Sequence, residues 1–522
     1  MFNYSTKGRR YSYIRYLKLS ATFLLTCLLL ACNSASLKDN VEPPPDSSAI
    51  PPASHGPLSE IADNIYRTHG TEYSGFRILD NSHDGLYWRL ALIDSAVSSL
   101  DIQTYLWYPD FSGRLILERA ILAAERGVMV RLMVDDLILQ EHDQLIANLH
   151  AHPFIEFRLF NPWQDRSSTI DRVGEMLARM ERLNTRMHDK LMIVDGHAAI
   201  VGGRNIGDHY FGLSETYNFH DTDLLGIGHI ALQANDMFDQ FWNSNWVVSA
   251  SNLSTQPDTM IAAEQWETLQ KNANAPQLES FPPSDIDWTD QLTLYASELR
   301  IGKSRLIFDE AAEEQIDKSM LSSMFNFFGL AQSELLIMNA YVIPADSGVD
   351  FLRDLGDRGV DVKILTNSLA SHDVPAVNSH YEPWRDDFLK AGVELYELRS
   401  DPAIKEKIVD ISGVKSGFTG LHSKTAVVDR RYVFIGSMNL DPRSARINTE
   451  MGAFVDSPEL AADMAEIIER NMTGANSWRV ALTAQGNILW TNDETTVDRQ
   501  PARDGMQRVM NVLMKLGPKD QF

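Results

Sequence analysis

Two short stretches of this sequence carry the same reactive side chains in the same spacing. His188 and Lys190 stand two residues apart in the first stretch, and His422 and Lys424 do so in the second. On a β-strand, residues i and i+2 point to the same face, so each histidine is expected beside its lysine. An imidazole next to an ammonium group suits an anion, and lysine binds phosphate as a point charge. The pattern therefore predicts chemistry on a phosphate.

The two stretches stay alike beyond the histidine and the lysine. Both fit the pattern H-x-K-x4-D-x6-G-(G/S)-x-N without a gap. Its further members, in the first and the second stretch, are Asp195 and Asp429, Gly203 and Ser437, and Asn205 and Asn439. A single H-x-K favours a buried strand with a hydrogen-bonded histidine and a solvated lysine. Two extended copies favour a shared site, in which two histidines, two lysines and two asparagines surround one phosphate.

The elements around these stretches repeat at a nearly constant separation. The separations are 234 residues from His188 to His422, 236 from Tyr105 to Tyr341 and 232 from Gly127 to Gly359. We predict helices over 84–97, 114–126 and 348–358, and strands over 100–107, 128–134, 335–341 and 360–365. The two glycines are expected to end helices. Chance similarity of two βαβ segments is the alternative, but the fixed separation indicates a duplicated α/β unit.

Length and composition set the organisation of the chain. Its 522 residues are too many for one ordinary hydrophobic core, and 44% hydrophobic with 23% charged residues is typical of a folded protein. We expect two halves, at 58–249 and 301–522, joined by a polar and irregular connection over 250–300. Residues 1–31 hold five bases and no acids, so the rest of the chain carries 42 bases against 71 acids, or −29. Such an acidic body argues against nucleic acid as a partner.

The N-terminus has the features of an export signal. Basic residues precede an apolar run over 19–30, which is too short for a transmembrane helix. The run ends in Leu-Leu-Ala-Cys at Cys32, which resembles the lipobox of bacterial lipoproteins. That resemblance implies a signal peptide over 1–31, an acylated Cys32 and a periplasm-facing lipid anchor, and Asn33 favours the outer over the inner membrane. An uncleaved signal anchor is the alternative. The Pro- and Ser-rich residues 32–57 are expected to form a solvated tether.

With its doubled motif, the chain resembles the phospholipase D superfamily over roughly residues 76–475. Within it, the sequence looks most like the bacterial cardiolipin synthases of the C type. The closer likeness lies in residues 158–163, 202–211, 364–374, 392–398 and 439–452. Two departures are the glycine at Gly203, where the family has serine, and a lipobox in place of paired transmembrane helices. The resemblance implies two fused α/β/α halves with mixed sheets, related by a pseudo-twofold axis, with the active site at their interface.

The same resemblance implies a phosphatidyltransferase that makes cardiolipin from two phospholipids through a phosphohistidine. We assign His188 as nucleophile and His422 as general acid and base, although the near-symmetric pattern permits the reverse. The lysines and asparagines of the motif, with Gly203 and Ser437, would surround the phosphate. Glu450 matches the family glutamate that orients a histidine, and in the first half we choose Asp223 over Glu215 for this role. Asp195 and Asp429 belong to the motif, but a structural role is at least as good an interpretation.

Three functions compete at this stage. A phosphatidyltransferase agrees with the resemblance, a hydrolase (a phospholipase D or a nuclease) uses the same chemistry, and an inactive scaffold disagrees with two intact motifs. The acidic body argues against a nuclease. Phospholipids at a membrane surface are the expected partners. The resemblance implies chemistry without a cofactor or a metal. In agreement, Cys27 and Cys32 both lie at the N-terminus, outside the folded body, and His197, His209, His220 and His229 show no spacing typical of a metal site.

Overall fold

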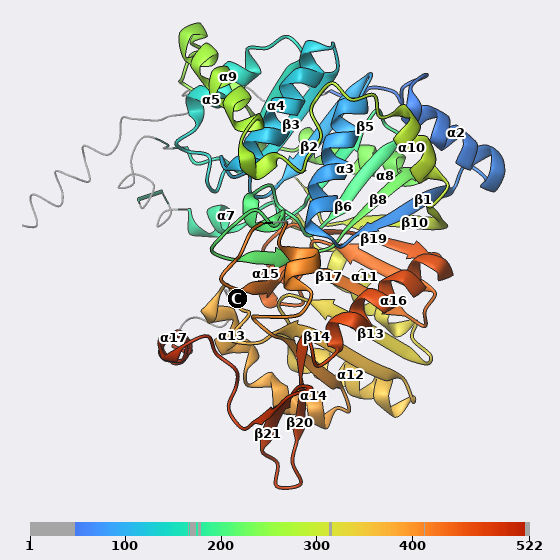
Figure 1. The fold of residues 1–522 in the computed structure, drawn as a ribbon, viewed down its shortest axis with the longest axis vertical. Helices are drawn as coiled ribbons and strands as arrows, with labels where there is room; N and C mark the ends of the chain where they lie inside the picture. Colours follow the sequence, from blue (N-terminus) through green and yellow to red (C-terminus); the bar gives the residue numbers. More distant parts are fainter. Residues whose placement is uncertain are drawn as a thin grey trace, which may run out of the picture.

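The computed structural model describes residues 47–516, except 165, 167–173, 176–178, 313–315 and 412. The expected signal peptide, Cys32 and residues 33–46 lie outside the described residues. The chain forms two stacked halves, coloured blue to green and yellow to red (Figure 1). No helix within the described ranges is both long enough and apolar enough to cross a membrane.

The first half alternates strands and helices. Its elements are α2 (Pro57–His69), β1 (Tyr73–Leu79), α3 (Ser82–Ser95), β2 (Ser99–Thr104), α4 (Phe111–Glu125), β3 (Met129–Asp135), α5 (Asp143–His150), β4 (Ile155–Phe160), α7 (Met180–Asn184), β5 (Leu191–Val194), β6 (Ala198–Gly202), β7 (Asn218–His220), β8 (Asp223–Gly228), α8 (His229–Trp242) and β9 (Val247–Ser249).

The second half repeats this plan and adds a C-terminal extension. Its elements are β10 (Arg300–Phe308), β11 (Glu310–Ala311), β12 (Ile316–Asp317), α11 (Met320–Gly329), β13 (Glu334–Asn339), α12 (Asp346–Asp357), β14 (Asp361–Asn367), α13 (Pro375–Tyr381), α14 (Trp384–Lys390), β15 (Glu394–Leu398), β16 (Thr419–Leu421), β17 (Lys424–Val428), β18 (Tyr432–Gly436), α15 (Pro442–Arg446), β19 (Met451–Asp456), α16 (Pro458–Met472), β20 (Ser477–Leu482), β21 (Ile488–Thr491), β22 (Thr496–Val497) and α17 (Gly505–Met514).

The strand order shows the duplication directly. The first half runs β9-β4-β3-β2-β5-β6-β8-β1, and the second runs β20-β15-β14-β13-β17-β18-β19-β10. In each half three neighbouring strands are parallel and the others antiparallel, so the sheet is mixed. Strand β1 pairs antiparallel with β10 and joins both halves into one 18-stranded sheet. The predicted α/β class with two related halves is therefore confirmed.

Local sequence signals explain the helices that position the motif. Gly127 and Gly359 follow α4 and α12 with φ of 92° and 84°, a left-handed conformation that glycine adopts without strain. Asn81 and Asp110 cap α3 and α4 by accepting hydrogen bonds from the N–H groups of His83 and Gly113. Helices α8 and α16 share one apolar core with strands of both halves, so this core fixes the two halves against each other.

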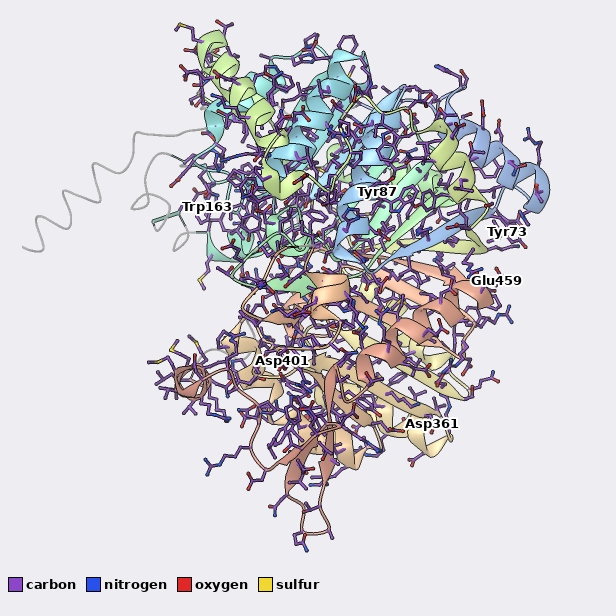
Figure 2. The ribbon with its side chains drawn as sticks, viewed as in Figure 1. Tyr73, Tyr87, Trp163, Asp361, Asp401 and Glu459 are labelled. Carbon is purple, nitrogen blue, oxygen red and sulfur yellow. The ribbon has the colours of Figure 1, made fainter. Side chains whose placement is uncertain are left out.

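Two expected segments differ in the structure. The connection contains helices α9 (Thr259–Ala273) and α10 (Thr289–Ala296) rather than irregular chain. Tyr87 of α3, labelled in Figure 2, donates a hydrogen bond to Gln291 of α10 at 2.9 Å. Residues 47–53 of the expected tether lie on the first half, because their polar groups find partners there: Trp242 Nε1 donates to Ser47 Oγ at 2.9 Å.

Candidate active site

Backbone hydrogen bonds across the interface hold both motif histidines. The N–H of His188, just before β5, donates to the carbonyl of Thr449 in the other half at 3.1 Å. The N–H of His422, between β16 and β17, donates to the carbonyl of His220 at 2.8 Å. Strands β7 and β16, one from each half, also pair in parallel. Each reactive segment is therefore positioned by the opposite half.

The side chains cross the interface in the same way. Nδ1 of His188 lies 3.0 Å from Oε2 of Glu450, and Nδ1 of His422 lies 2.6 Å from Oδ2 of Asp221. Each histidine is thus oriented by a carboxylate of the other half. With Nδ1 occupied, Nε2 is the ring nitrogen left for reaction.

Buried lysines and aromatic rings surround the two histidines. Lys190 Nζ donates to the carbonyl of His188 at 2.5 Å, and Lys424 Nζ donates likewise to the carbonyl of His422. Tyr105 meets the His188 ring edge-on at 5.2 Å between centroids. The rings that pack on His422 are Tyr210 at 5.2 Å and Phe219 at 4.9 Å. These contacts limit the rotation of both imidazoles.

The electrostatics of the two pairs differ. Burial, with the charges of Lys190 and Lys424, lowers the pKa of His188 well below its ordinary value. Burial also raises the pKa of its partner Glu450 to about 7, against the attraction of Lys190. His188 is therefore a neutral imidazole at neutral pH, beside a carboxyl group that is partly protonated.

The second pair holds an ionised carboxylate. Burial works to raise the pKa of Asp221, but the charge and hydrogen bond of His422, with Lys424, outweigh it and keep that pKa well below its ordinary value. A negative charge thus faces His422 and works to raise its pKa, while burial and Lys424 outweigh it and keep the pKa of His422 below its ordinary value. In the first motif, burial lowers the pKa of Lys190 to about 7.

Comparisons with known proteins identify the family of the chain. A family model described as "Cardiolipin synthase, PLD-like domain" matches residues 90–242 and 324–472. Cardiolipin synthase C of Escherichia coli (strain K12) is 34% identical over 457 residues, which cover 84% of this chain and 94% of that protein. The chain belongs to the cardiolipin synthase, phospholipase D-like family. The predicted family is confirmed, and the chain is an enzyme of that family.

Two further matches agree with this assignment. The major cardiolipin synthase ClsA of Bacillus subtilis (strain 168) is 26% identical over 436 residues, which cover 82% of this chain and 75% of that protein. The crystal structure of phosphatidylserine synthase from Haemophilus influenzae Rd KW20 has a TM-score of 0.52 at 14% identity, covering 80% of this chain and 91% of that one. The latter likeness supports the phospholipase D-like fold.

The prediction that Asp223 orients a histidine is wrong. Its carboxylate receives hydrogen bonds from Arg89 at 2.9 Å and Arg204 at 3.1 Å. Strand register explains the error: Gly202 pairs with Asp223 in the first half, as Gly436 pairs with Gly452 in the second. Asp223 is therefore the counterpart of Gly452, and Asp221 is the counterpart of Glu450. The rejected alternative, Glu215, is exposed.

Gly203 and Ser437, also motif counterparts, are matched to carboxylates of different length. Ser437 Oγ donates to Oε2 of Glu450 at 2.5 Å and accepts from the N–H of Met451 at 3.0 Å. A Cβ atom on Gly203 would come within 2.3 Å of Oδ1 of Asp221. The glycine therefore makes room for the shorter aspartate, which explains the departure from the family pattern in the first half.

The motif aspartates do not join the reactive groups. The Asp195 carboxylate accepts the N–H groups of Val97, Ser98 and Ser99, and that of Asp429 accepts those of residues 332–334. Both residues have positive φ, 54° and 51°. They fix the turns after β5 and β17 and the starts of β2 and β13, so their role is structural, and a catalytic role for them is not supported by this geometry.

The motif asparagines are both buried, in environments that differ. Asn205 Nδ2 donates to the hydroxyl of Tyr210 at 2.7 Å, and its Oδ1 accepts the N–H of Leu106. Oδ1 of Asn439 is buried and has no hydrogen-bond partner among the described residues.

The sequence did not indicate three features of the site: Asp221, Tyr105 beside His188, and the rings that pack on His422. Both carboxylates stand just before a strand, Asp221 two residues before β8 and Glu450 one residue before β19, but this feature is too general to single out Asp221.

Proposed function

We propose that this enzyme makes cardiolipin by transferring a phosphatidyl group from one phospholipid to another through a phosphohistidine. The single observation that carries the proposal is the crossed arrangement, in which Glu450 contacts His188 and Asp221 contacts His422. It supplies two oriented imidazoles from opposite halves, as an in-line displacement at phosphorus requires. The relatives named cardiolipin synthase support the choice of product.

The reaction then has two steps that share these histidines. Nε2 of His188 attacks phosphorus, an N–P bond forms, and the P–O bond to the donor headgroup breaks while His422 protonates the departing alcohol. The hydroxyl of the acceptor lipid next gives its proton to His422 and attacks phosphorus, so that a new P–O bond forms and the N–P bond breaks. Lys190, Lys424 and the two motif asparagines would stabilise the developing charge on the phosphate oxygens.

The electrostatic difference between the two pairs supports this division of roles. A nucleophile needs an unprotonated ring, and His188 has a pKa well below its ordinary value because of burial and two lysines. A general acid needs a proton to give, and the ionised Asp221 favours the protonated ring of His422 against burial and Lys424, which lower its pKa below the ordinary value. The reverse assignment would place the general acid beside Glu450, which carries less negative charge at neutral pH than Asp221 does.

Labelled lipids test the activity. The purified enzyme receives a donor labelled in its phosphatidyl group, with and without an unlabelled phosphatidylglycerol acceptor. We expect labelled cardiolipin whose yield rises with acceptor, and none with His188→Ala. Labelled phosphatidic acid as the main product in excess acceptor would instead identify a hydrolase and contradict the proposal.

We also propose that the enzyme is anchored to the bacterial envelope through an acylated Cys32, facing the periplasm, with the outer membrane favoured. The basic N-terminus, the short apolar run and its Leu-Leu-Ala-Cys end support this. Mass spectrometry of the N-terminal peptide from membrane fractions tests it. A mature chain that begins at a diacylglyceryl cysteine is expected, and an unmodified Cys32 would overturn the proposal.

A further inference from the structure

The C-terminal helix α17 turns its polar residues toward the protein and its apolar residues toward solvent. Gln507 and Asn511 are the residues that it buries. The exposed apolar side chains on and just after the helix are Met506 (69%), Val509 (54%), Val512 (62%), Leu513 (54%) and Leu516 (88%). Several of these follow the i, i+3, i+4, i+7 spacing of one helix face. A surface helix in water normally has the opposite orientation.

Hydrogen bonds fix this inverted orientation. Gln507 Nε2 donates to the carbonyl of Leu369 at 2.5 Å. Asn511 accepts from Asn378 Nδ2 at 2.7 Å and donates to Glu382 at 3.0 Å. Turning the helix to bury its apolar face would break all three bonds and leave buried polar groups unpaired, which is costly. The outward apolar face is therefore built into the fold.

The helix is attached to the rim of the active site. Arg503, just before α17, donates to the carbonyls of Ala370 at 2.8 Å and His372 at 3.2 Å, in the loop that follows β14. At the end of β14, Asn367 exchanges two hydrogen bonds with the backbone of Leu421, at 2.7 and 2.8 Å. Leu421 immediately precedes His422. Figure 1 shows α17 beside α13, at the edge of the second half.

The charge of this segment differs from that of the whole chain. Between residues 499 and 516 the bases are Arg499, Arg503, Arg508 and Lys515, and Asp504 is the one acid. The chain as a whole carries −24. An apolar helix face flanked by basic residues matches a surface that is apolar inside and anionic outside.

We propose that α17 lies in the interface of an anionic phospholipid bilayer, with its apolar face among the acyl chains, and thereby holds the active-site rim against its lipid substrates. The inference rests on the proposed function in that its substrates are membrane lipids. A bilayer is favoured over a second copy of the chain because one ten-residue helix offers far less than the roughly 800 Å² that each partner buries in a stable dimer.

A depth measurement at α17 tests the proposal directly. In the full-length chain, Cys27 and Cys32 are replaced by serine, and Leu513→Cys receives an environment-sensitive fluorophore. The control carries the same label at Leu294→Cys, on helix α10, where the leucine is 66% exposed. The apolar N-terminal run can hold either protein on a vesicle, so each label reports only its own position. We expect brominated lipids in vesicles of phosphatidylethanolamine and phosphatidylglycerol to quench the label at 513 and not that at 294.

A second variant separates this proposal from the proposed function. Val509→Gln with Val512→Gln should lower turnover on these vesicles by about tenfold or more, because two immersed apolar side chains are lost. Turnover on monomeric short-chain phosphatidylglycerol should not change. Equal quenching at both positions, or unchanged turnover on vesicles, would overturn the role of α17. A shift that depends on protein concentration without vesicles would assign the face to a second copy instead. Quenching at 513 without transfer on either substrate would sink the proposed function alone.

Discussion

Glu450, from the second half of the chain, lies 3.0 Å from Nδ1 of His188 in the first half. The contact fixes the ring and its tautomer, because an N–H on Nδ1 that faces a carboxylate leaves the Nε2 lone pair for reaction. Asp221 repeats this contact with His422 in the opposite direction. Neither half therefore holds a complete histidine–carboxylate pair of its own, so a change of either carboxylate should impair the histidine of the opposite half.

Glu450→Gln should lower kcat by about 10- to 100-fold, because the amide keeps the shape of the side chain but loses its charge and can present the wrong group to Nδ1. Stability should change little, since Glu450 is buried with a pKa of about 7. Glu469→Gln is the matched control, because Glu469 makes a surface ion pair with Arg430. Steady-state kinetics and thermal melts check both variants, and an unchanged kcat in Glu450→Gln would refute the orienting role.

Asp221→Asn and Asp223→Asn should fail in different ways, although the residues are two apart. Asp221→Asn should fold and lose most of its kcat, since the negative charge at His422 disappears. Asp223→Asn should lose about 3–5 kcal/mol of unfolding free energy, because Arg89 and Arg204 would be left buried without their carboxylate. Urea unfolding and kcat, measured on both, separate the two effects. The reverse outcome would favour Asp223 as the orienting group.

Gly203→Ala should move the Asp221 carboxylate, because the new Cβ would lie within 2.3 Å of Oδ1. We expect a loss of kcat of about tenfold or more with a destabilisation of about 1–3 kcal/mol. Gly329→Ala is the control, since a Cβ there meets nothing within 4 Å. Full activity of Gly203→Ala would show that the glycine is not needed to accommodate the aspartate.

Asp189 and Glu450 should each make a contribution to stability that falls as the pH rises, up to about pH 8 for Asp189 and about pH 7 for Glu450. Burial raises the pKa of Asp189 to about 8 and that of Glu450 to about 7, against ordinary values of 3.8 and 4.5. Between these values the folded state binds more protons than the unfolded state, so each group removes up to about 1.4 kcal/mol of stability per pH unit. Asp189→Asn should flatten the dependence of unfolding free energy on pH. A pH dependence in Asp189→Asn identical to that of the unaltered protein would contradict the shift at Asp189.

Local patterns in the sequence were sufficient to predict the repeated α/β unit. The helices before Gly127 and Gly359 end where those glycines adopt positive φ, and the strands after them follow as expected. Helix α9 was missed because it is polar and buries only Leu269 and Asn272, so its apolar periodicity is weak. Helix α17 buries Gln507 and Asn511 and turns its apolar residues outward, so the apolar spacing in its sequence does not indicate which side faces the protein.

The histidines, the lysines and Glu450 were predictable, but Asp221 and the crossing of each carboxylate to the opposite half were not. His188 and His422 are recognised by their identical surroundings in the sequence. Their carboxylates come from the opposite half and depend on the register of β8 and β19, which is a long-range property. Between the motif asparagine and the carboxylate the first half has 16 residue steps and the second has 11, so spacing did not reveal that Asp221 matches Glu450.

The most direct test of the shared site is to trap the intermediate. His422→Ala is mixed with a phosphatidyl donor that has a very good leaving group, and the protein is digested and analysed by mass spectrometry. Because this donor needs no general acid, the phosphatidyl adduct should form and persist on His188, while His188→Ala should form none. An adduct on His422 in His188→Ala, or near-normal turnover by either variant on a natural phospholipid, would contradict the account in which His188 and His422 act in sequence on one phosphate.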